Sequence, residues 1–197
     1  MSGLYNRQQK LKLDTDISIT IVGCGGIGFW VAKFAAMSGI EKMYLFDPDI
    51  IEEHNLNRLD IPYKFIGRNK SDITKLMINS IRPDCTVYAF PYKFSDMHTT
   101  DTDWLIDCTD NHESQLENQR IAGSQYGMKY VKAGYDGESF SIHNSVAEWG
   151  ESEDGYQIVP SWVVPATVVA ALTVAKIMKY KSSETITNVE NLFRIDR

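Results

Sequence analysis

The run Gly23-Cys24-Gly25-Gly26-Ile27-Gly28 has the spacing G-x-G-x-x-G, which is typical of loops that bind phosphate. It lies between an apolar segment, 17–22, and a stretch with helical periodicity, 29–37. Such a loop turns tightly, lets a phosphate approach bare backbone and packs the next helix against the sheet. The helix then presents unpaired N–H groups and a partial positive charge to the phosphate. We therefore expect a nucleotide site, with a purely structural glycine turn as the alternative.

Asp47 ends the next apolar segment, 42–47, at roughly the 20-residue spacing from the glycine loop at which an acidic residue meets ribose hydroxyls. The alternative is that Asp47 only caps a turn at Pro48. Together with the glycine loop, Asp47 predicts a nucleotide but leaves open whether it is a dinucleotide or ATP.

Length and composition are those of one globular domain. The chain has 197 residues, of which 43% are hydrophobic and 23% are charged. A hydride-transfer enzyme usually adds a separate substrate domain, so the length favours ATP over a dinucleotide. The net charge of -6 argues against a protein that coats nucleic acid.

Cysteine and histidine usage argues against a zinc site. The three cysteines, Cys24, Cys85 and Cys108, include no C-x-x-C pair, so we expect neither a disulfide framework nor zinc. We expect all three to be small buried thiols. The four histidines show no ligand spacing.

Two segments bear on location. Residues 1–16 are polar and lack the apolar region of a secretory signal, so the cytoplasm is the expected location. Residues 156–175 carry no charge and are long enough on paper to cross a bilayer. Pro160 and Pro165 interrupt this segment, and a buried helix that starts near Pro165 explains it better than a membrane span.

Strands and helices are predicted to alternate along the chain. The predicted strands are 17–22, 42–47, 86–90, 104–107, 129–133 and 139–147. The predicted helices are 29–37, 69–81 and 113–126, after a polar helical arm at 4–12. This order predicts an α/β fold, Rossmann-like and doubly wound, with a mainly parallel sheet and an antiparallel extension. We expect one domain, divided into an arm at 1–16, a nucleotide-binding sheet with its helices at 17–147, and a short crossover with a C-terminal helix at 148–197.

Ligands of such sheets bind at the carboxyl ends of the strands. Gly23, Asp47 and the segment from Asp107 to Asn111 all lie at predicted strand ends. The sequence therefore predicts that these residues meet at one edge of the sheet.

Seven short motifs occur in the order and at roughly the spacing of one enzyme family. They are Arg7-Gln8, Gly23-x-Gly25-Gly26-x-Gly28, Asp47-x-Asp49, Asn55-Leu56-Asn57-Arg58, Ile66-Gly67-Arg68-Asn69-Lys70, Arg82-Pro83 and Asp107-Cys108-Thr109-Asp110-Asn111. Over nearly its whole length the chain resembles the ThiF/MoeB family, which comprises ATP-dependent activators related to the adenylating half of ubiquitin-activating enzymes. The resemblance includes a proline-started C-terminal helix at 160–180.

The resemblance implies a reaction in which a carboxylate attacks the α-phosphate of ATP and pyrophosphate leaves. Such a reaction needs negative charge neutralised on both sides of the phosphorus and the groups held in line. By the resemblance, the glycine loop and Asp47 bind the nucleotide, and Arg58 and Lys70 bind its phosphates. Asp110, beside Asn111, holds magnesium.

Two further residues have roles by the resemblance. Asn55 helps to shape the phosphate pocket. Arg7 matches an arginine that reaches into the ATP site of the partner subunit in dimeric relatives, so a homodimer is expected. Arginine suits this task because its planar fork stays charged and can bind two phosphate oxygens. A disordered or idle terminal arm is the alternative for Arg7.

The other assigned residues also have ordinary alternatives. Arg58 and Lys70 could be solvated surface charges. Asp110 with Asn111 could cap the helix at 113–126. The joint occurrence of all these residues favours the functional interpretation.

The sequence departs from the family at three places. Leu59 stands where a glutamine usually follows the Asn-Leu-x-Arg run, and Gln115 stands where an arginine often follows the Asp-Asn pair. The segment 147–160 is short and has no cysteine, whereas many relatives place a nucleophilic cysteine or zinc-binding pairs there. We therefore expect the reaction to stop at the acyl adenylate, or to pass it to a nucleophile on another molecule.

The sequence leaves two function classes in contention. The first is a compact adenylyltransferase that uses ATP and Mg²⁺ to activate a carboxylate, such as the C-terminal glycine of a ubiquitin-like or sulfur-carrier protein. The second is a noncatalytic subunit that holds nucleotide or a partner within a heteromeric activating enzyme. Retention of Arg7, Arg58, Lys70 and Asp110 favours the enzyme. An NAD-dependent oxidoreductase ranks third, because residues 55–70 have no evident task in hydride transfer.

Overall fold

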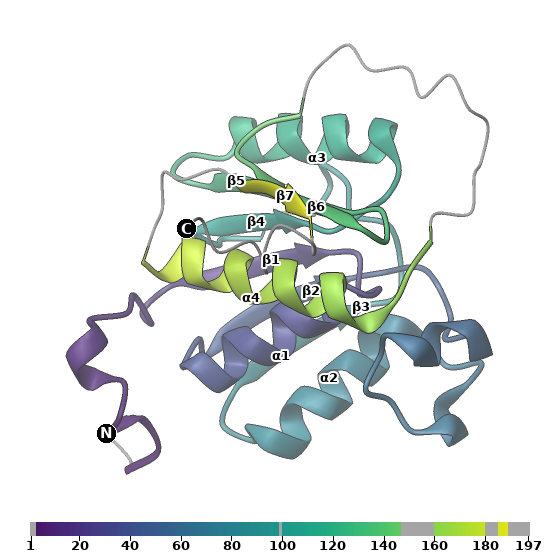
Figure 1. Ribbon diagram of the computed structural model, residues 1–197. Helices are drawn as coiled ribbons and strands as arrows, with labels where there is room; N and C mark the ends of the chain where they lie inside the picture. Colours follow the sequence, from purple (N-terminus) through teal and green to yellow (C-terminus); the bar gives the residue numbers. More distant parts are fainter. Residues whose placement is uncertain (1–2, 99, 147–159, 180–184, 189–197) are drawn as a thin grey trace, which may run out of the picture.

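One sheet lies between two layers of helices (Figure 1). The computed structural model describes residues 3–98, 100–146, 160–179 and 185–188. Seven strands form the sheet in the order β3-β2-β1-β4-β5-β6-β7. Their bounds are β1 Ser18–Val22, β2 Lys42–Phe46, β3 Thr86–Phe90, β4 Trp104–Asp107, β5 Lys129–Tyr135, β6 Ser139–His143 and β7 Thr185–Asn188.

The strand directions confirm the predicted fold class. β3, β2, β1, β4 and β5 pair in parallel, whereas β6 and β7 pair antiparallel at one side of the sheet. Strand order reverses between β1 and β4, and this is the switch point at which doubly wound sheets bind ligands.

Helices cover both faces of the sheet (Figure 1). α1 (Gly28–Ser38), α2 (Lys70–Ile81) and α4 (Val163–Met178) pack on one face, and α3 (His112–Ser124) packs on the other, over β4 and β5. Short 3-10 helices at Glu53–Asn57 and Tyr63–Phe65 lie between β2 and α2. None of the described helices is both long and apolar enough to cross a membrane.

The central strands are apolar on both faces, as parallel strands buried between helix layers must be. On β1, Ile19 and Ile21 belong to the core cluster shared with α1 and α4. Val22 and Leu105 belong to a second cluster that packs under α3. Both clusters hold the carboxyl ends of β1 and β4 in fixed positions.

Local signals set the helix ends near the site. The side chain of Asn69 accepts hydrogen bonds from the backbone N–H groups of Ser71 and Asp72, at 2.8 and 3.2 Å, and so starts α2. Gly39 ends α1, as predicted, with a φ of 106° in the left-handed region that favours glycine.

The structure differs from the sequence-based expectation at several element bounds. The arm has two 3-10 turns, Gly3–Tyr5 and Gln9–Leu11, in place of one helix. β6 ends at His143, and residue 147 of the predicted strand lies outside the described residues. As predicted, Pro165 lies in the first turn of α4, where the N–H group that proline lacks would have no partner within the helix. β7 was not predicted, and the division of the chain into arm, sheet and crossover stays a prediction.

Candidate functional site

A cavity of about 1010 Å³ lies at the carboxyl ends of β1, β2 and β4. Eight of the residues assigned from the sequence line it: Gly23, Gly25, Gly26, Asp47, Arg58, Lys70, Asp110 and Asn111. Small-molecule sites have volumes of roughly 300–1,000 Å³, so the cavity is at the upper end of that range. It has room for more than a nucleotide.

The glycine loop has the geometry that its spacing predicts. Gly23 has a φ of +88°, and a Cβ there would lie 3.0 Å from the backbone oxygen of Cys108. A Cβ on Gly28 would overlap the backbone oxygen of Gly23, so only glycine lets α1 start this close to β1. A Cβ on Gly25 would meet no protein atom within 4 Å. The loop therefore turns tightly, packs closely and leaves open space over Gly25 for a ligand.

Asp47 is buried at the end of β2 and fixes the glycine loop. Its Oδ2 accepts a hydrogen bond from the backbone N–H of Cys24 at 2.6 Å, and its Oδ1 accepts one from Asp49 at 2.8 Å. Burial raises the pKa of the Asp47 carboxyl, while these two N–H groups and the nearby Lys70 ammonium oppose the rise. A carboxylate has about four acceptor positions, so Asp47 keeps capacity for ribose hydroxyls.

Lys70 begins α2 and points its ammonium toward the cavity. Its Nζ lies 2.9 Å from Oδ2 of Asp49, and its side chain is 14% exposed. The side chain of Asn69 donates to the backbone oxygens of Asp47 and Asp49, at 2.9 and 3.0 Å. These bonds join the start of α2 to the end of β2, so Lys70 is not a freely solvated charge.

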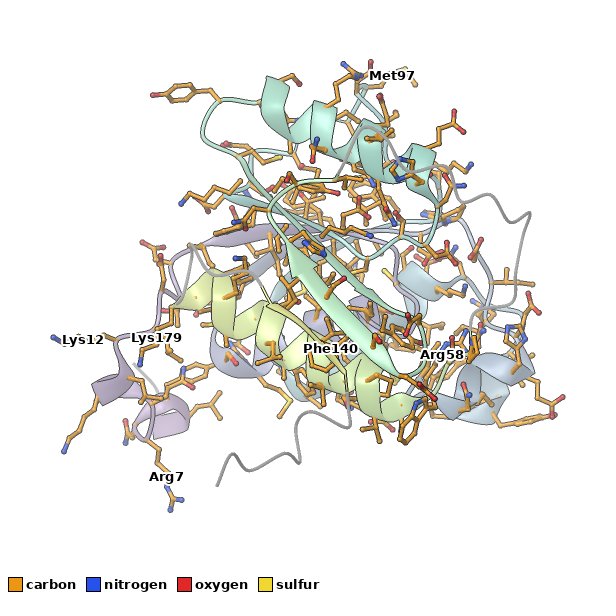
Figure 2. The ribbon with its side chains drawn as sticks, turned by 45° about the horizontal axis from the view of Figure 1, so that its top comes forward. Arg7, Lys12, Arg58, Met97, Phe140 and Lys179 are labelled. Atoms are coloured by element: carbon orange, nitrogen blue, oxygen red, sulfur yellow. The ribbon has the colours of Figure 1, made fainter. Side chains whose placement is uncertain are left out.

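Arg58 lies against the glycine loop and lines the cavity (Figure 2). A Cβ on Gly26 would lie 3.0 Å from Cδ of Arg58 and 2.8 Å from the hydroxyl of Tyr135. The indole N–H of Trp30 holds the Arg58 backbone by donating to its oxygen at 2.8 Å. The guanidinium donates to the backbone oxygen of His54 at 3.0 Å. Arg58 is thus a positioned cation beside the expected phosphate path.

Asn55 is buried and does not belong to the described lining of the cavity. Its Oδ1 accepts a hydrogen bond from the N–H of Glu52 at 3.1 Å, which caps the short helix Glu53–Asn57. Its backbone oxygen accepts a hydrogen bond from the N–H of Arg58 at 3.0 Å. Any influence of Asn55 on the phosphate pocket therefore passes through the placement of Arg58.

Asp110 lies on a loop that a buried carboxylate anchors. Oδ1 of Asp107, at the end of β4, accepts hydrogen bonds from the N–H and the hydroxyl of Thr109, at 2.9 and 2.7 Å. Its Oδ2 accepts bonds from the side chains of Asn118 and Tyr130, at 3.0 and 2.9 Å. Burial raises the pKa of Asp107, and these donors oppose the rise. The exposed carboxylate of Asp110 then faces the cavity.

The cap of α3 belongs to Asn111. Its side chain accepts a hydrogen bond from the backbone N–H of Ser114 at 2.9 Å. The alternative that Asp110 with Asn111 caps this helix thus applies to Asn111. The carboxylate of Asp110 can still bind a cation.

No group of three or more His, Cys, Asp or Glu side chains that could hold a metal occurs among the described residues. Mg²⁺ is commonly bound through one or two carboxylates together with substrate phosphates and water. A lone Asp110 beside an open phosphate path fits that mode of binding.

Arg7 lies outside the cavity, on the arm, and points away from the body of the protein (Figure 2). The arm is docked at its base: the side chain of Gln8 donates to the backbone oxygen of Ser38 at 2.7 Å. The guanidinium of Arg82 lies 5.1 Å from the ring centre of Tyr5. Arg7 therefore cannot complete the site of its own chain in this conformation.

Sequence reasoning missed three roles. Arg82 was noted only as part of a motif, but its buried guanidinium donates to the backbone oxygen of Ala36 and pairs with Asp84 at 2.7 Å, clamping α1, α2 and the arm. Asp107 was not singled out as the anchor of the Asp110 loop. Lys132, on β5, lines the cavity opposite the nucleotide residues and was not considered. A charged residue inside an apolar strand was the available signal for Asp107 and Lys132.

The cysteines have the environment of structural thiols. Cys24 and Cys85 are buried, as expected, whereas Cys108 is only half-buried and lines the cavity. Burial raises the pKa of Cys24 and Cys108 well above the ordinary value and that of Cys85 to about 11. A thiol with a raised pKa is a poor nucleophile at neutral pH.

A sequence profile described as the ThiF family matches residues 4–196. The chain belongs to the ThiF family. One cavity of this ThiF-family chain contains the glycine loop, Asp47, Arg58, Lys70 and Asp110, and the roles assigned to these residues stay predictions.

Relatives of this ThiF-family chain are longer. It is 28% identical over 165 residues to ubiquitin-like modifier-activating enzyme 5 of Bombyx mori, a match that covers 76% of this chain and 41% of the relative. For the same enzyme of Oryza sativa subsp. japonica the identity is 26% over 167 residues, and the match covers 76% of this chain and 39% of the relative. For tRNA threonylcarbamoyladenosine dehydratase of Haemophilus influenzae the identity is 35% over 99 residues, and the match covers 47% of this chain and 38% of the relative. The chain spans about two-fifths of the length of these relatives.

Solved structures share the fold. The crystal structure of E. coli MccB superimposes with a TM-score of 0.71 at 22% identity, covering 85% of this chain and 55% of that chain. The structure of selenomethionine PaaA superimposes with a TM-score of 0.69 at 20% identity, and the match covers 90% of this chain and 62% of that chain. At these identities the likeness is one of fold.

Proposed function

We propose that this chain activates a carboxylate by ATP-dependent adenylation, forming an acyl adenylate and pyrophosphate. The observation that carries the proposal is that one cavity holds a glycine loop at a helix start, a buried acid, two positioned cations and the exposed carboxylate of Asp110. Family membership supports the same reaction class.

The arrangement divides the work among the residues. Asp47 receives the ribose at the end of β2, and the loop from Gly23 to Gly28 receives the phosphates at the start of α1. Arg58 and Lys70 stabilise the charge that develops on the departing pyrophosphate. Asp110 holds Mg²⁺, whose other ligands are phosphate oxygens and water.

The proposed acyl substrate is the C-terminus of a small protein or peptide, such as a ubiquitin-like or sulfur-carrier protein ending in glycine. Two kinds of relative support this choice. One is named as an activating enzyme for ubiquitin-like modifiers, and structures of MccB include one with ATP and one with N-formylated MccA. The volume of the cavity leaves room for such a tail beside the nucleotide.

The chain is proposed to form no thioester of its own. Raised pKa values disfavour thiolate at Cys24, Cys85 and Cys108. The segment 147–160, where many relatives carry a cysteine, has none. The acyl adenylate therefore leaves the chain or is attacked by a nucleophile from another molecule.

We also propose a homodimer in which Arg7 completes the ATP site of the partner subunit. The outward direction of Arg7 and the docking of Gln8 on α1 support this (Figure 2). Apolar side chains are exposed at the start of α4 and farther along it, where Trp162, Val163 and Leu172 are 44%, 37% and 37% exposed, and they offer apolar contact surface.

A noncatalytic subunit is the second candidate, and the position of Arg7 outside the cavity of its own chain favours it. ATP–pyrophosphate exchange with a panel of peptides ending in glycine separates the two. We expect exchange that depends on ATP, Mg²⁺ and a free C-terminal carboxylate, with an acyl adenylate detected by mass spectrometry. ATP binding without any exchange would instead support the noncatalytic subunit.

A further inference from the structure

The β5–β6 hairpin forms the side of the cavity farthest from Asp47. In its register Lys132 pairs with His143 and Gly134 with Ser141, and all four residues line the cavity. The alternate residues Ala133, Phe140 and Ile142 belong to the core cluster, and Ala133 and Phe140 also contribute to the cavity lining (Figure 2). The hairpin therefore presents a polar surface, Lys132, Gly134, Ser141 and His143, to the cavity.

The side chain of Lys132 bends along β5 over Gly134. A Cβ on Gly134 would lie 3.8 Å from both Cε and Nζ of Lys132 and 3.8 Å from the hydroxyl of Ser141. The Lys132 ammonium and the Ser141 hydroxyl thus both border the space over Gly134, a position that lacks a side chain. Such a surface has space for an extended segment of another chain.

Lys132 makes no ion pair with any residue that the structure describes. Two other lysines line the cavity: Lys70 is paired with Asp49 at 2.9 Å, and Lys93 lies on the loop that follows β3. A half-buried ammonium without a counter-charge loses part of its hydration, and no ion pair compensates for that loss. An anion supplied by a ligand would restore that balance.

The sheet order separates Lys132 from the glycine loop. Lys132 is in register with Asp107 on β4, and β4 is next to β1, which carries the glycine loop. Two strand spacings separate β5 from β1, or roughly 10 Å. An extended chain rises about 3.3 Å per residue, so this distance corresponds to about three residues. The reacting carboxylate must reach the α-phosphate near the loop, so Lys132 faces an earlier part of the acyl substrate.

We propose that Lys132, with Ser141 and His143, forms a specificity subsite that binds an acidic side chain two to four residues from the C-terminus of the acyl substrate. This inference rests on the proposed adenylation and adds a substrate class to it. A side-chain carboxylate keeps its charge through the reaction, whereas the reacting carboxylate loses its charge on adenylation. A lysine committed to the reacting carboxylate would also lower its nucleophilicity.

The test uses octapeptides ending in glycine, with glutamate, glutamine or lysine at the second, third or fourth position from the end. Peptide binding to the ATP-loaded protein is measured by fluorescence anisotropy, and turnover by ATP–pyrophosphate exchange. We expect glutamate at one of these positions to tighten binding at least tenfold over glutamine. Lys132→Gln should abolish this preference, and Lys132→Glu should favour the peptide with lysine at that position. Lys129→Gln, the same charge change on the exposed start of β5, should keep the glutamate preference.

Three outcomes count against the subsite. One is equal binding of glutamate and glutamine peptides at every position, and another is a preference that survives in Lys132→Gln. Failure of all peptides to bind at millimolar concentration also counts against it. Charge-selective binding without exchange would instead contradict adenylation and leave Lys132 as a binding determinant.

Discussion

The backbone N–H of Cys24 donates a hydrogen bond to Oδ2 of Asp47 at 2.6 Å, and this bond joins the glycine loop to the end of β2. The residue expected to bind ribose therefore also fixes the loop expected to bind phosphate. Because the two parts of the nucleotide site share one bond, disturbing the loop should disturb binding of the whole nucleotide.

Gly28→Ala tests the loop geometry. The added Cβ would overlap the backbone oxygen of Gly23, so the loop or α1 must move. We expect a loss of about 1–3 kcal/mol in the free energy of unfolding and at least tenfold weaker ATP binding. The matched control is Gly123→Ala in α3, where a Cβ meets nothing within 4 Å and alanine should stabilise the helix by about 0.5–1 kcal/mol. Urea unfolding and calorimetric titration with ATP measure both, and wild-type ATP affinity in Gly28→Ala would refute this account of the loop.

Asp107→Asn tests the buried anchor through the pH dependence of stability. Burial raises the pKa of Asp107 above its ordinary value of 3.8, so its contribution to stability is full below that value and is lost as pH rises through the raised pKa. The free energy of unfolding of the wild type relative to Asp107→Asn should therefore fall as pH rises in this window.

Asp84→Asn provides the control of opposite sign. The hydrogen bond from Arg82 lowers the pKa of Asp84, so the contribution of Asp84 is present above 3.8 and is lost as pH falls through the lowered pKa. Urea unfolding of both variants between pH 3 and pH 7.5 makes the comparison, and slopes of the same sign would be inconsistent with the burial of Asp107.

Replacing Cys24, Cys85 and Cys108 together by alanine should leave acyl adenylate formation within a few fold of the wild type. The reason is that none has the lowered pKa or exposure of a nucleophilic thiol. Pyrophosphate exchange measures activity, and nonreducing mass spectrometry detects adducts. The single variant Cys108→Ala tests the half-buried thiol at the cavity separately. A reducible adduct with the substrate that disappears on replacing one cysteine would place this chain among thioester-forming enzymes.

Mixing Arg7→Ala with Asp110→Asn tests the homodimer. Each variant should be inactive alone, whereas a mixed dimer has one site with both residues intact. Random exchange should therefore restore about a quarter of wild-type activity, because about half of the dimers are mixed and each has one of two sites. Light scattering checks the oligomeric state and mass spectrometry checks exchange. A monomer at all accessible concentrations, or no recovery after verified exchange, would rule the arrangement out.

The fold followed from the sequence because its signals are local and consistent. Apolar segments alternate with helical periodicity, and Gly39, Asn69 and Pro165 mark helix ends that the structure confirms. β7, Thr185–Asn188, is a short segment of mixed polar and apolar residues, and it was not predicted from the sequence. A strand at the edge of a sheet is stabilised by pairing with its neighbour, here β6, more than by its own residues.

Side-chain roles that depend on distant partners were not predictable. Arg82 acts by reaching Ala36 and Tyr5, which are far from it in the sequence. β5 was expected at 129–133 and runs to Tyr135, and the place of Lys132 in the cavity depends on the antiparallel partner β6. The motif residues around Asp47, Arg58 and Asp110 were brought together as expected.

The most direct test of the central claim is ATP–pyrophosphate exchange by Asp110→Asn with a carboxylate substrate that the wild type accepts. Loss of the carboxylate that holds Mg²⁺ removes several kcal/mol of transition-state stabilisation, so exchange should fall by orders of magnitude while the unfolding curve stays unchanged. Asp101→Asn, the same change on an exposed loop outside the cavity, should retain full exchange. Full exchange activity in Asp110→Asn would contradict the assignment of this carboxylate and the adenylation mechanism built on it.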